Sequence, residues 1–327
     1  MTLAGTGIIV VSGQIIWWRE NRPGRHDMTS VLCIGEAMVE IALAPDRPDT
    51  AGLGFAGDTL NTAIYLKRTA PGLRVAYGTK LGRDGLSDRM IAMIEAEGLD
   101  TALIRRSETR VPGLYAINTD GNGERSFTYW RENSAARRLM EPPGLEESDL
   151  SGFDLVYLSA ISLAILPPAG RARLMGWLRH YRDAGGRVAF DSNYRPALWS
   201  DQGTAQETVT DAWRLTDIGL PSLEDELALF GDPDEAALLE RLRRYGLGEG
   251  VLKRGARGPL PLNGSPPLAI KPATGVVDST AAGDSFNAGY LAAKLDGMDE
   301  TESMQAGHGL ALRVIGHRGA ILPREER

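Results

Sequence analysis

Residues 276–295, VVDSTAAGDSFNAGYLAAKL, hold the pattern with the clearest chemical use. A strand-like VVD leads into Ala281, Ala282 and Gly283, and Asp284 follows in the first turn of an expected helix. Small residues at such a junction leave backbone N–H groups open to a phosphate or a developing oxyanion. A carboxylate repels such an anion, so Asp284 makes sense there as a base that takes a proton from an attacking hydroxyl. A helix cap is an equally good interpretation of Asp284 from the residues alone.

Two common nucleotide-binding fingerprints are absent from the sequence. No G-x-x-x-x-G-K-[ST] occurs, which excludes a P-loop enzyme, and no G-x-G-x-x-G follows the first strand, which argues against a dinucleotide-dependent dehydrogenase. If the protein binds a nucleotide, a structural element other than these two motifs must hold it.

Composition narrows the class of partner. With 36 basic and 43 acidic residues among 327, the formal charge of −7 argues against nucleic acid or an anionic membrane as the main partner. The single cysteine, Cys33, allows neither an intrachain disulfide nor a cysteine zinc site, and its apolar neighbours indicate a buried core position. The four histidines follow no metal-ligand pattern, so no protein ligand for a metal is assigned.

From residue 30 onward, short β-rich runs alternate with longer helical ones. This alternation predicts an α/β fold, a mainly parallel sheet with helices on both faces. The expected strands are 31–35, 74–82, 153–159, 187–193, 216–222 and 250–255. The expected helices are 58–68, opened by an Asp58 cap, 85–98, ending on Gly98, and 169–184, 222–230, 234–245, 282–297 and 299–314.

One stretch breaks the alternation. Residues 111–131 are typical of two strands around a turn at 120–123, and residues 37–45 contain an alternating run that could join them. A small sheet inserted into an α/β core often forms a lid over a pocket, although an ordinary edge hairpin has the same pattern. We therefore predict one domain, residues 30–327, with a β lid.

Residues 1–29 do not resemble the rest. Their apolar run, 8–18, is shorter than the roughly 20 residues of a membrane span and lacks the marks of a signal peptide. We interpret them as a dispensable extension, with Met28 as the functional start and an amphipathic anchor as the lesser alternative. No other targeting segment is present, which predicts a cytoplasmic protein.

DSTAAGDSFNAG closely resembles the second signature of the PfkB family of carbohydrate kinases, which have the ribokinase-like fold. Other blocks follow in the family's order and cover nearly everything from residue 30 to residue 323. They are AGDTLNTAIYLKR, with Ala56 in place of the first glycine of the usual pair, and GTKLGRDGLSDRM, DSNYRPALW, PSLEDE and VLKRGARG. The resemblance implies a three-layer sandwich with a small β-sheet lid.

Within the family, DSNYRPALW, the Thr-Ala-Ala-Gly-Asp variant and RSFTYWRENSAA resemble the 2-keto-3-deoxygluconate kinase branch most. That likeness implies transfer of the ATP γ-phosphoryl group to the 6-hydroxyl of 2-keto-3-deoxygluconate. Such a substrate carries a carboxylate, and Arg131 and Arg195 are the candidates for pairing with it. A lone arginine is otherwise most often a solvated surface ion pair.

The resemblance also implies roles for single residues. Asp284 would be the base, and backbone N–H groups of Ala281, Ala282 and Gly283 would stabilise the transferred group. The residues that would meet the sugar are Gly57, Asp58, Asn61, Tyr115 and Tyr129. The two tyrosines could equally be a cross-strand packing pair.

For ATP, the matching positions are Ser222 and Glu224 near the phosphates and Mg²⁺, Lys253, Gly255 and Gly258 in the nucleotide loop, and His308 near the adenine. Mg²⁺ would bridge phosphates largely through water. A packed helix histidine is an equal interpretation of His308.

Three other interpretations compete. One is another PfkB sugar kinase, such as a fructokinase or a 5-keto-2-deoxygluconokinase. The second is a non-catalytic sugar-binding protein of the same fold, and the third is a dehydrogenase. The family likeness further implies a homodimer joined through the lid.

Overall fold

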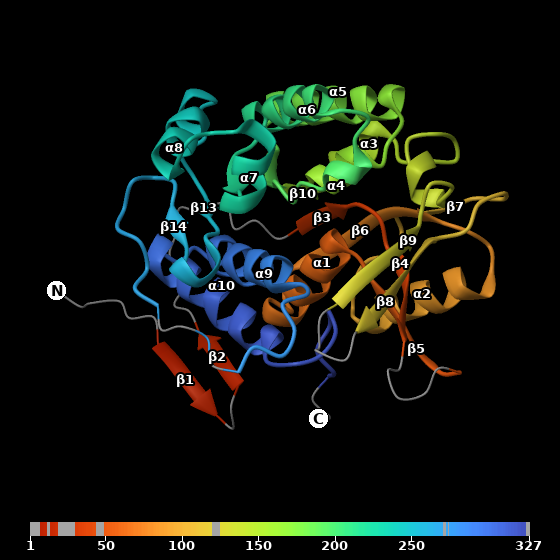
Figure 1. Ribbon diagram of the computed structural model, residues 1–327, viewed down its shortest axis with the longest axis horizontal. Coiled ribbons are helices and arrows are strands. Elements are labelled where there is room, and N and C mark those ends of the chain that lie inside the picture. The colour runs from red at the N-terminus through yellow and green to blue at the C-terminus, as the bar shows by residue number, and fades with distance from the viewer. Residues whose placement is uncertain are drawn as a thin grey trace.

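The structure is a computed structural model that describes residues 7–11, 14–18, 30–43, 49–119, 125–270, 273 and 275–324. At its centre lies a six-stranded parallel sheet in the order β12-β11-β10-β3-β6-β7 (Figure 1). Strands β3, β6, β10 and β11 are almost wholly buried, because helices cover both faces of the sheet. The strands are β3 (Ser30–Ile34), β6 (Arg74–Leu81), β7 (Ile104–Arg106), β10 (Leu155–Ser159), β11 (Arg187–Asp191) and β12 (Ile218–Leu220).

Each face of the sheet has its own apolar core. One core is covered by α1 (Asp58–Thr69), α2 (Gly85–Ala96), α9 (Ala282–Leu295) and α10 (Glu300–Ile315), and it includes Cys33 as expected. The other is covered by α3 (Glu147–Leu150), α4 (Ala160–Ala164), α5 (Pro168–Asp183), α6 (Gln202–Arg214), α7 (Leu223–Phe230) and α8 (Glu235–Arg244). The predicted α/β/α sandwich is confirmed (Figure 1).

A second sheet of four strands forms the lid, in the order β5-β4-β8-β9. Its strands are β4 (Met38–Leu43), β5 (Ala51–Ala56), β8 (Gly113–Thr119) and β9 (Arg125–Trp130). Strand β5 was not expected, because Gly52 and Gly54 lower its β propensity. Side chains of β4 pack against both glycines. A Cβ on Gly54 would lie 3.3 Å from the Glu40 carboxylate, and a Cβ on Gly52 would lie 3.7 Å from the Cβ of Ala42.

Two short hairpins complete the strands. Strands β13 (Val251–Leu252) and β14 (Leu260–Pro261) flank a 3-10 turn (Gly255–Arg257), and bridges from residues 250 and 253 to residues 219 and 222 set them beside β12. Strands β1 (Gly7–Val11) and β2 (Gln14–Trp18) pair within the N-terminal extension. Further 3-10 turns are Ala135–Arg138 and Pro196–Leu198. Within the described ranges, no helix is both long and apolar enough to cross a bilayer.

Three local predictions were wrong. Residues 276–278 form no strand, although they are apolar, and Val276 and Val277 are more than half exposed. Helix α1 is capped by Gly57 without a side-chain bond, and Asp58 points elsewhere. Helix α6 was missed because Gly203 and three threonines are poor helix formers, although its buried residues, 205, 209, 212 and 213, have helical spacing.

Candidate active site

The N-terminus of α9 is open, as the sequence indicated. Its cap, Ala281, has the left-handed φ of 60°, which turns the chain abruptly into the helix. The N–H of Ala282, which was predicted to face the transferred group, instead donates to the Ser279 carbonyl at 3.2 Å and closes this turn. The next N–H groups, those of Gly283 and Asp284, lie in the first turn, where a helix offers unpaired donors to an anion.

Asp284 has no capping bond in the structure, and its side chain is turned toward the core of the site. The amide of Asn61 donates to its Oδ2 at 2.8 Å. Burial and the negative charge of Asp58 together raise the pKa of Asp284 to about 8. A carboxylate with so high a pKa holds a proton more firmly than a surface aspartate, which suits a general base.

Lys253 lies beside the helix terminus. Its Nζ donates to Asp191 Oδ2 at 2.8 Å and to Asn287 Oδ1 at 3.1 Å. A Cβ on Gly283 would lie 3.7 Å from the same ammonium group. The buried Asn287 amide also donates to Asp191 at 2.6 Å, so the lysine and both of its partners are fixed. The cation therefore stands next to the N–H groups that would face a phosphate.

Asp58 completes this cluster. Its Oδ2 accepts from the Ser159 hydroxyl and, at 3.0 Å, from the Asn193 amide. The preceding Gly57 is required by contact, because a Cβ there would lie 2.2 Å from the carbonyl oxygen of Glu36. We call the six side chains Asp58, Asn61, Asp191, Lys253, Asp284 and Asn287 the catalytic hub.

The inner face of the lid carries a row of aromatic rings. Tyr115 and Tyr129 lie opposite each other across β8 and β9, with ring centroids 5.8 Å apart, and Phe127 extends the row. Tyr115 is buried and donates to Glu40, while Tyr129 is half exposed. The predicted cross-strand pair is thus present, with one ring open to a ligand.

The two predicted carboxylate-binding arginines occupy different environments. Arg131 follows β9 and forms a buried ion pair with Glu36. Arg195 is 53% exposed and donates to the Tyr194 carbonyl at 2.7 Å and to Asp225 at 3.3 Å. Burial raises the pKa of Asp225, whereas the Arg195 charge opposes that rise.

The predicted nucleotide residues divide into two groups. Ser222 caps α7 and its N–H donates to Ser192 Oγ at 2.8 Å, whereas Glu224 is exposed in the first turn of α7. Gly255 and Gly258 both have positive φ, and a Cβ on Gly258 would lie 2.9 Å from Ile270. Gly258 thereby allows the 268–270 segment to pack closely over the loop.

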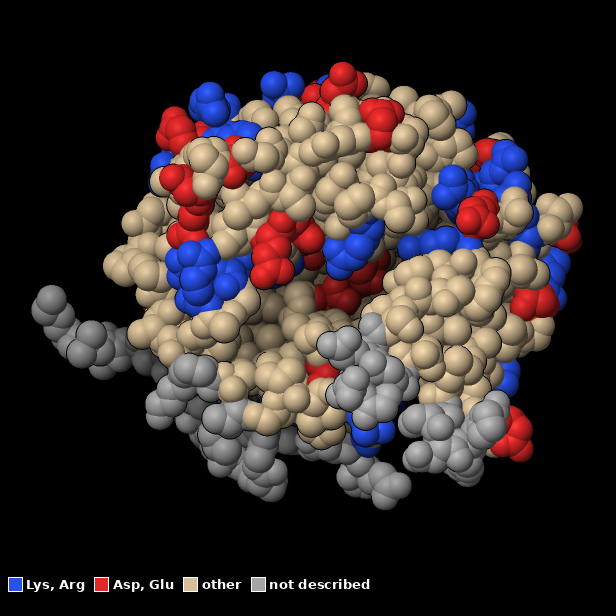
Figure 2. Space-filling view, viewed as in Figure 1, with Lys and Arg blue, Asp and Glu red and all other residues tan. Residues whose placement is uncertain are grey.

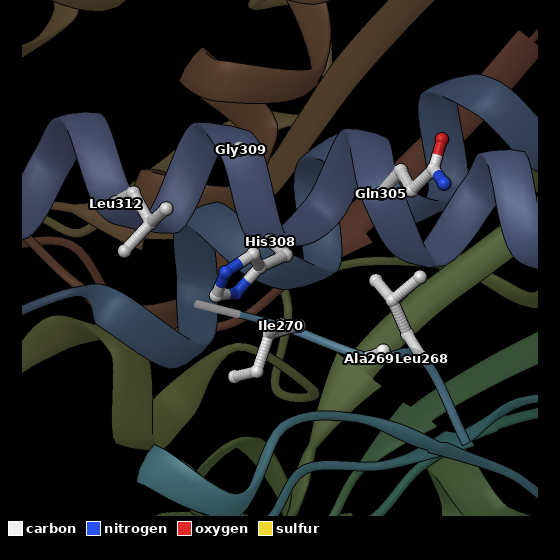
Figure 3. Close-up of a pocket in the computed structure, with 7 residues that line it drawn as sticks. All are labelled: Leu268, Ala269, Ile270, Gln305, His308, Gly309 and Leu312. Carbon is white, nitrogen blue, oxygen red and sulfur yellow. The ribbon is translucent and has the colours of Figure 1, made fainter. Parts of the chain in front are cut away.

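His308 lines a cavity of about 240 Å³ between α10 and residues 268–270 (Figure 3). The other lining residues are Leu268, Ala269, Ile270, Gln305, Gly309 and Leu312. Burial lowers the pKa of His308, which keeps the imidazole neutral near pH 7. A mostly apolar slot with a neutral ring on its wall fits a flat heteroaromatic base.

Figure 2 shows a hollow between the main body and the lid, with acidic atoms at its bottom and basic atoms on its rim. Among the residues that the structure describes, no three His, Cys, Asp or Glu side chains are grouped to hold a metal ion.

The pfkB carbohydrate kinase family model matches residues 28–327. The chain belongs to the pfkB family of carbohydrate kinases. It is 44% identical over 305 residues to the 2-dehydro-3-deoxygluconokinase of Dickeya dadantii, which covers 90% of this chain and 97% of the relative. It is 42% identical over 307 residues to the enzyme of that name from Escherichia coli K12, with the same coverage. The crystal structure of a PfkB protein from Polaromonas sp. JS666 superimposes with a TM-score of 0.77 at 26% identity, over 88% of this chain and 95% of that one.

Several polar residues of this pfkB kinase site were missed from sequence. Asp191 and Asn193 lie in the block DSNYRPALW at the carboxyl end of β11, where open α/β sheets place ligands. Asn287 is one helical turn beyond Asp284, which was a usable signal. Glu36 gave no signal, because its partner Arg131 is far away in the chain.

Proposed function

We propose that this carbohydrate kinase transfers the γ-phosphoryl group of ATP to the 6-hydroxyl of 2-keto-3-deoxy-D-gluconate and releases ADP. The observation that carries the proposal is the position of Asp284, a carboxylate of raised pKa at the open N-terminus of α9 with Lys253 beside it. The relatives named above carry the name of this activity.

In this mechanism Asp284 accepts the proton of the 6-hydroxyl as its oxygen bonds to the γ-phosphorus and the bond to the ADP oxygen breaks. The N–H groups of Gly283 and Asp284, together with the Lys253 ammonium, face the charge that develops on the transferred group. Mg²⁺, when bound with the nucleotide, neutralises phosphate charge. Asn61 holds the Asp284 carboxylate in one orientation.

The sugar would lie between the hub and the lid. Asp58, held by Asn193, and Asn61, held by Asp284, would meet its hydroxyl groups, and Gly57 would leave room for them. Tyr129 would cover the sugar, and Arg131 and Arg195 would pair with its carboxylate. A neutral-sugar kinase has no use for this pair, so Arg195→Ala is expected to weaken acid substrates about 10-fold and neutral sugars hardly at all.

The adenine would occupy the cavity beside His308, with Ser222 and Glu224 on the phosphate side. Gly309 forms part of the cavity wall, and no atom lies within 4 Å of where its Cβ would be. Gly309→Val would therefore project into the base site and raise the KM for ATP about 10-fold. Gly176→Val, at an equally open glycine of α5, is the matched control and should leave that KM unchanged.

The deciding experiment is coupled measurement of ADP release with ATP and Mg²⁺. The panel is 2-keto-3-deoxygluconate, its galactonate epimer, fructose, ribose and gluconate. A strong preference for the keto-deoxy acids supports the proposal. A preference for fructose or ribose would leave the assignments of the fold and the catalytic base unchanged but would show that the proposed substrate is wrong. No turnover with any of these compounds would favour a sugar-binding protein.

Two further proposals concern the whole chain. The outer face of the lid exposes Leu43, Leu53 and Trp130 at 44%, 44% and 57%, which supports a homodimer joined through this sheet. Sedimentation of the wild type and of Trp130→Ser tests it. We also propose that residues 1–29 are dispensable and that the protein is cytoplasmic. A chain starting at Met28 should keep full activity.

A further inference from the structure

The buried ion pair at the base of the lid is asymmetric. Glu36 is only 2% exposed and lies between β3 and β4, where the chain passes from the main sheet into the lid. Its Oε2 accepts from both Nε, at 2.9 Å, and Nη2 of Arg131. Its Oε1 is buried without a hydrogen-bond partner. The charge of Glu36 is thus balanced by one edge of one guanidinium group.

This contact determines which edge of Arg131 remains available. A guanidinium group has two edges that can grip a carboxylate, the Nε–Nη2 side and the Nη1–Nη2 end. Glu36 occupies the side. Among the hydrogen bonds of the described residues, none is made by Nη1, so the end of the group is left to donate elsewhere.

Neighbouring residues hold the pair in place. A Cβ on Gly113 would lie 2.8 Å from Glu36 Oε1 and 3.1 Å from Arg131 Cβ, so only glycine leaves room for both side chains. The carbonyl of Glu36 packs against Gly57 at the start of α1, beside the hub. The Arg131 guanidinium lies 5.9 Å from the ring of Tyr129. Glu36 therefore connects the start of the hub with the sugar-facing side of the lid.

We propose that Glu36 is a positioning residue for the sugar acid, because it turns Arg131 so that the Nη1–Nη2 end faces the substrate carboxylate. This inference rests on the proposed function, since it assigns Arg131 to that carboxylate. Glu36 itself does not touch the substrate. Its effect on affinity passes entirely through Arg131.

The pair also changes how Arg131 must be tested. Removing the arginine alone leaves a buried carboxylate without its counter-charge, which destabilises the fold apart from any effect on substrate. Glu36→Gln lessens this problem, because the amide oxygen can still accept from Arg131, whose side chain is 11% exposed.

The experiment compares Glu36→Gln with the wild type in steady-state kinetics on 2-keto-3-deoxygluconate and on fructose. We expect the KM for the acid to rise about 10-fold, with kcat and the KM for ATP within about twofold of wild type. Glu108→Gln, which breaks an exposed ion pair with Arg83, is the matched control and should change none of these values. An unchanged KM, or an equal change in all three values, would overturn the proposal.

A double-mutant cycle separates positioning from a general effect on the fold. In an Arg131→Met background, Glu36→Gln should no longer change the KM for the acid, because its route to the substrate is gone. A further 10-fold rise in that background contradicts the proposal. If Glu36→Gln does not fold, Gly113→Ala is the alternative variant. The added methyl group would displace Glu36 and Arg131 without changing the charge of either, and it should also raise the KM for the acid.

The wild-type measurements distinguish a failure of this inference from a failure of the proposed function. If the wild type prefers fructose, the substrate assignment fails and Glu36 has no carboxylate to serve, so both fail together. If the wild type prefers the acid and Glu36→Gln does not change its KM, only the inference about Glu36 fails.

Discussion

Every side chain of the catalytic hub bonds to another polar group of the protein body, whereas the aromatic rings of the lid touch chiefly one another. Asp191, for example, accepts from both Lys253 and Asn287, while half of Tyr129 remains exposed. The groups that we propose for phosphoryl transfer are therefore held in place before a substrate arrives. The aromatic groups that we propose for sugar selection are still partly exposed and would be covered by the bound sugar.

The largest effect should follow from the hub. Asp284→Asn keeps the size of the side chain and removes the base, so kcat should fall about 10³-fold or more. The melting temperature should be unchanged or higher at pH 8, because burial already disfavours the charged form of Asp284. A variant that retains more than a tenth of wild-type kcat would show that another group takes the proton.

The pH profile probes the same carboxyl group without a mutation. Only deprotonated Asp284 can accept a proton, and its pKa is raised to about 8. kcat/KM for the sugar should therefore fall about 10-fold per unit as the pH drops below that value and level off above it. A profile flat from pH 6 to pH 9 would contradict this assignment.

Removal of an aromatic ring from the lid should weaken the binding of the sugar without slowing the chemical step. Tyr129→Ala is expected to raise the KM for the sugar about fivefold with little change in kcat, because the ring covers the substrate and no hub residue depends on it. Thr128→Ala, the preceding residue on the opposite face of β9, is the matched control. A fall in kcat without a change in KM would place Tyr129 in the chemical step.

The smallest expected effect concerns stability at the edge of the hub. Ala281 has a φ of 60°, a conformation that glycine adopts more easily. Ala281→Gly should raise the free energy of unfolding by about 1 kcal/mol. Ala282→Gly, inside the helix, should lower it. Urea unfolding of both variants measures the difference, and equal effects of the same sign would argue against backbone strain at residue 281.

The sequence predicted the main sheet and most helices because strands buried on both faces and amphipathic helices carry strong local patterns. Boundaries were less certain: the strand expected at 153–159 begins at Leu155, and that expected at 250–255 is only β13. Strand β5 and helix α6 were missed, since glycine in both and threonine in α6 lower the local propensity, which tertiary contacts override.

For the site, sequence led to Asp284 and Lys253 because both lie in short motifs. It could not show that Asp58 bonds to Ser159 and Asn193 and leaves the cap of α1 to Gly57. Nor could it pair Glu36 with Arg131. Contacts of this kind depend on how β10, β11 and the lid meet in space, and no local spacing encodes them.

The order of strands in the lid has a consequence for how the molecule is made. Strand β4 pairs in parallel with β8, joining Met38 to Gly113, and β5, α1, β6, α2 and β7 lie between them in the chain. A parallel pair needs a connection of this kind, because a tight turn cannot join two strands that run in the same direction. The lid therefore cannot form as a separate hairpin: its central pair exists only where the body of the protein brings β4 and β8 side by side. A substitution that destabilises the body should therefore also disturb the surface that we propose selects the sugar.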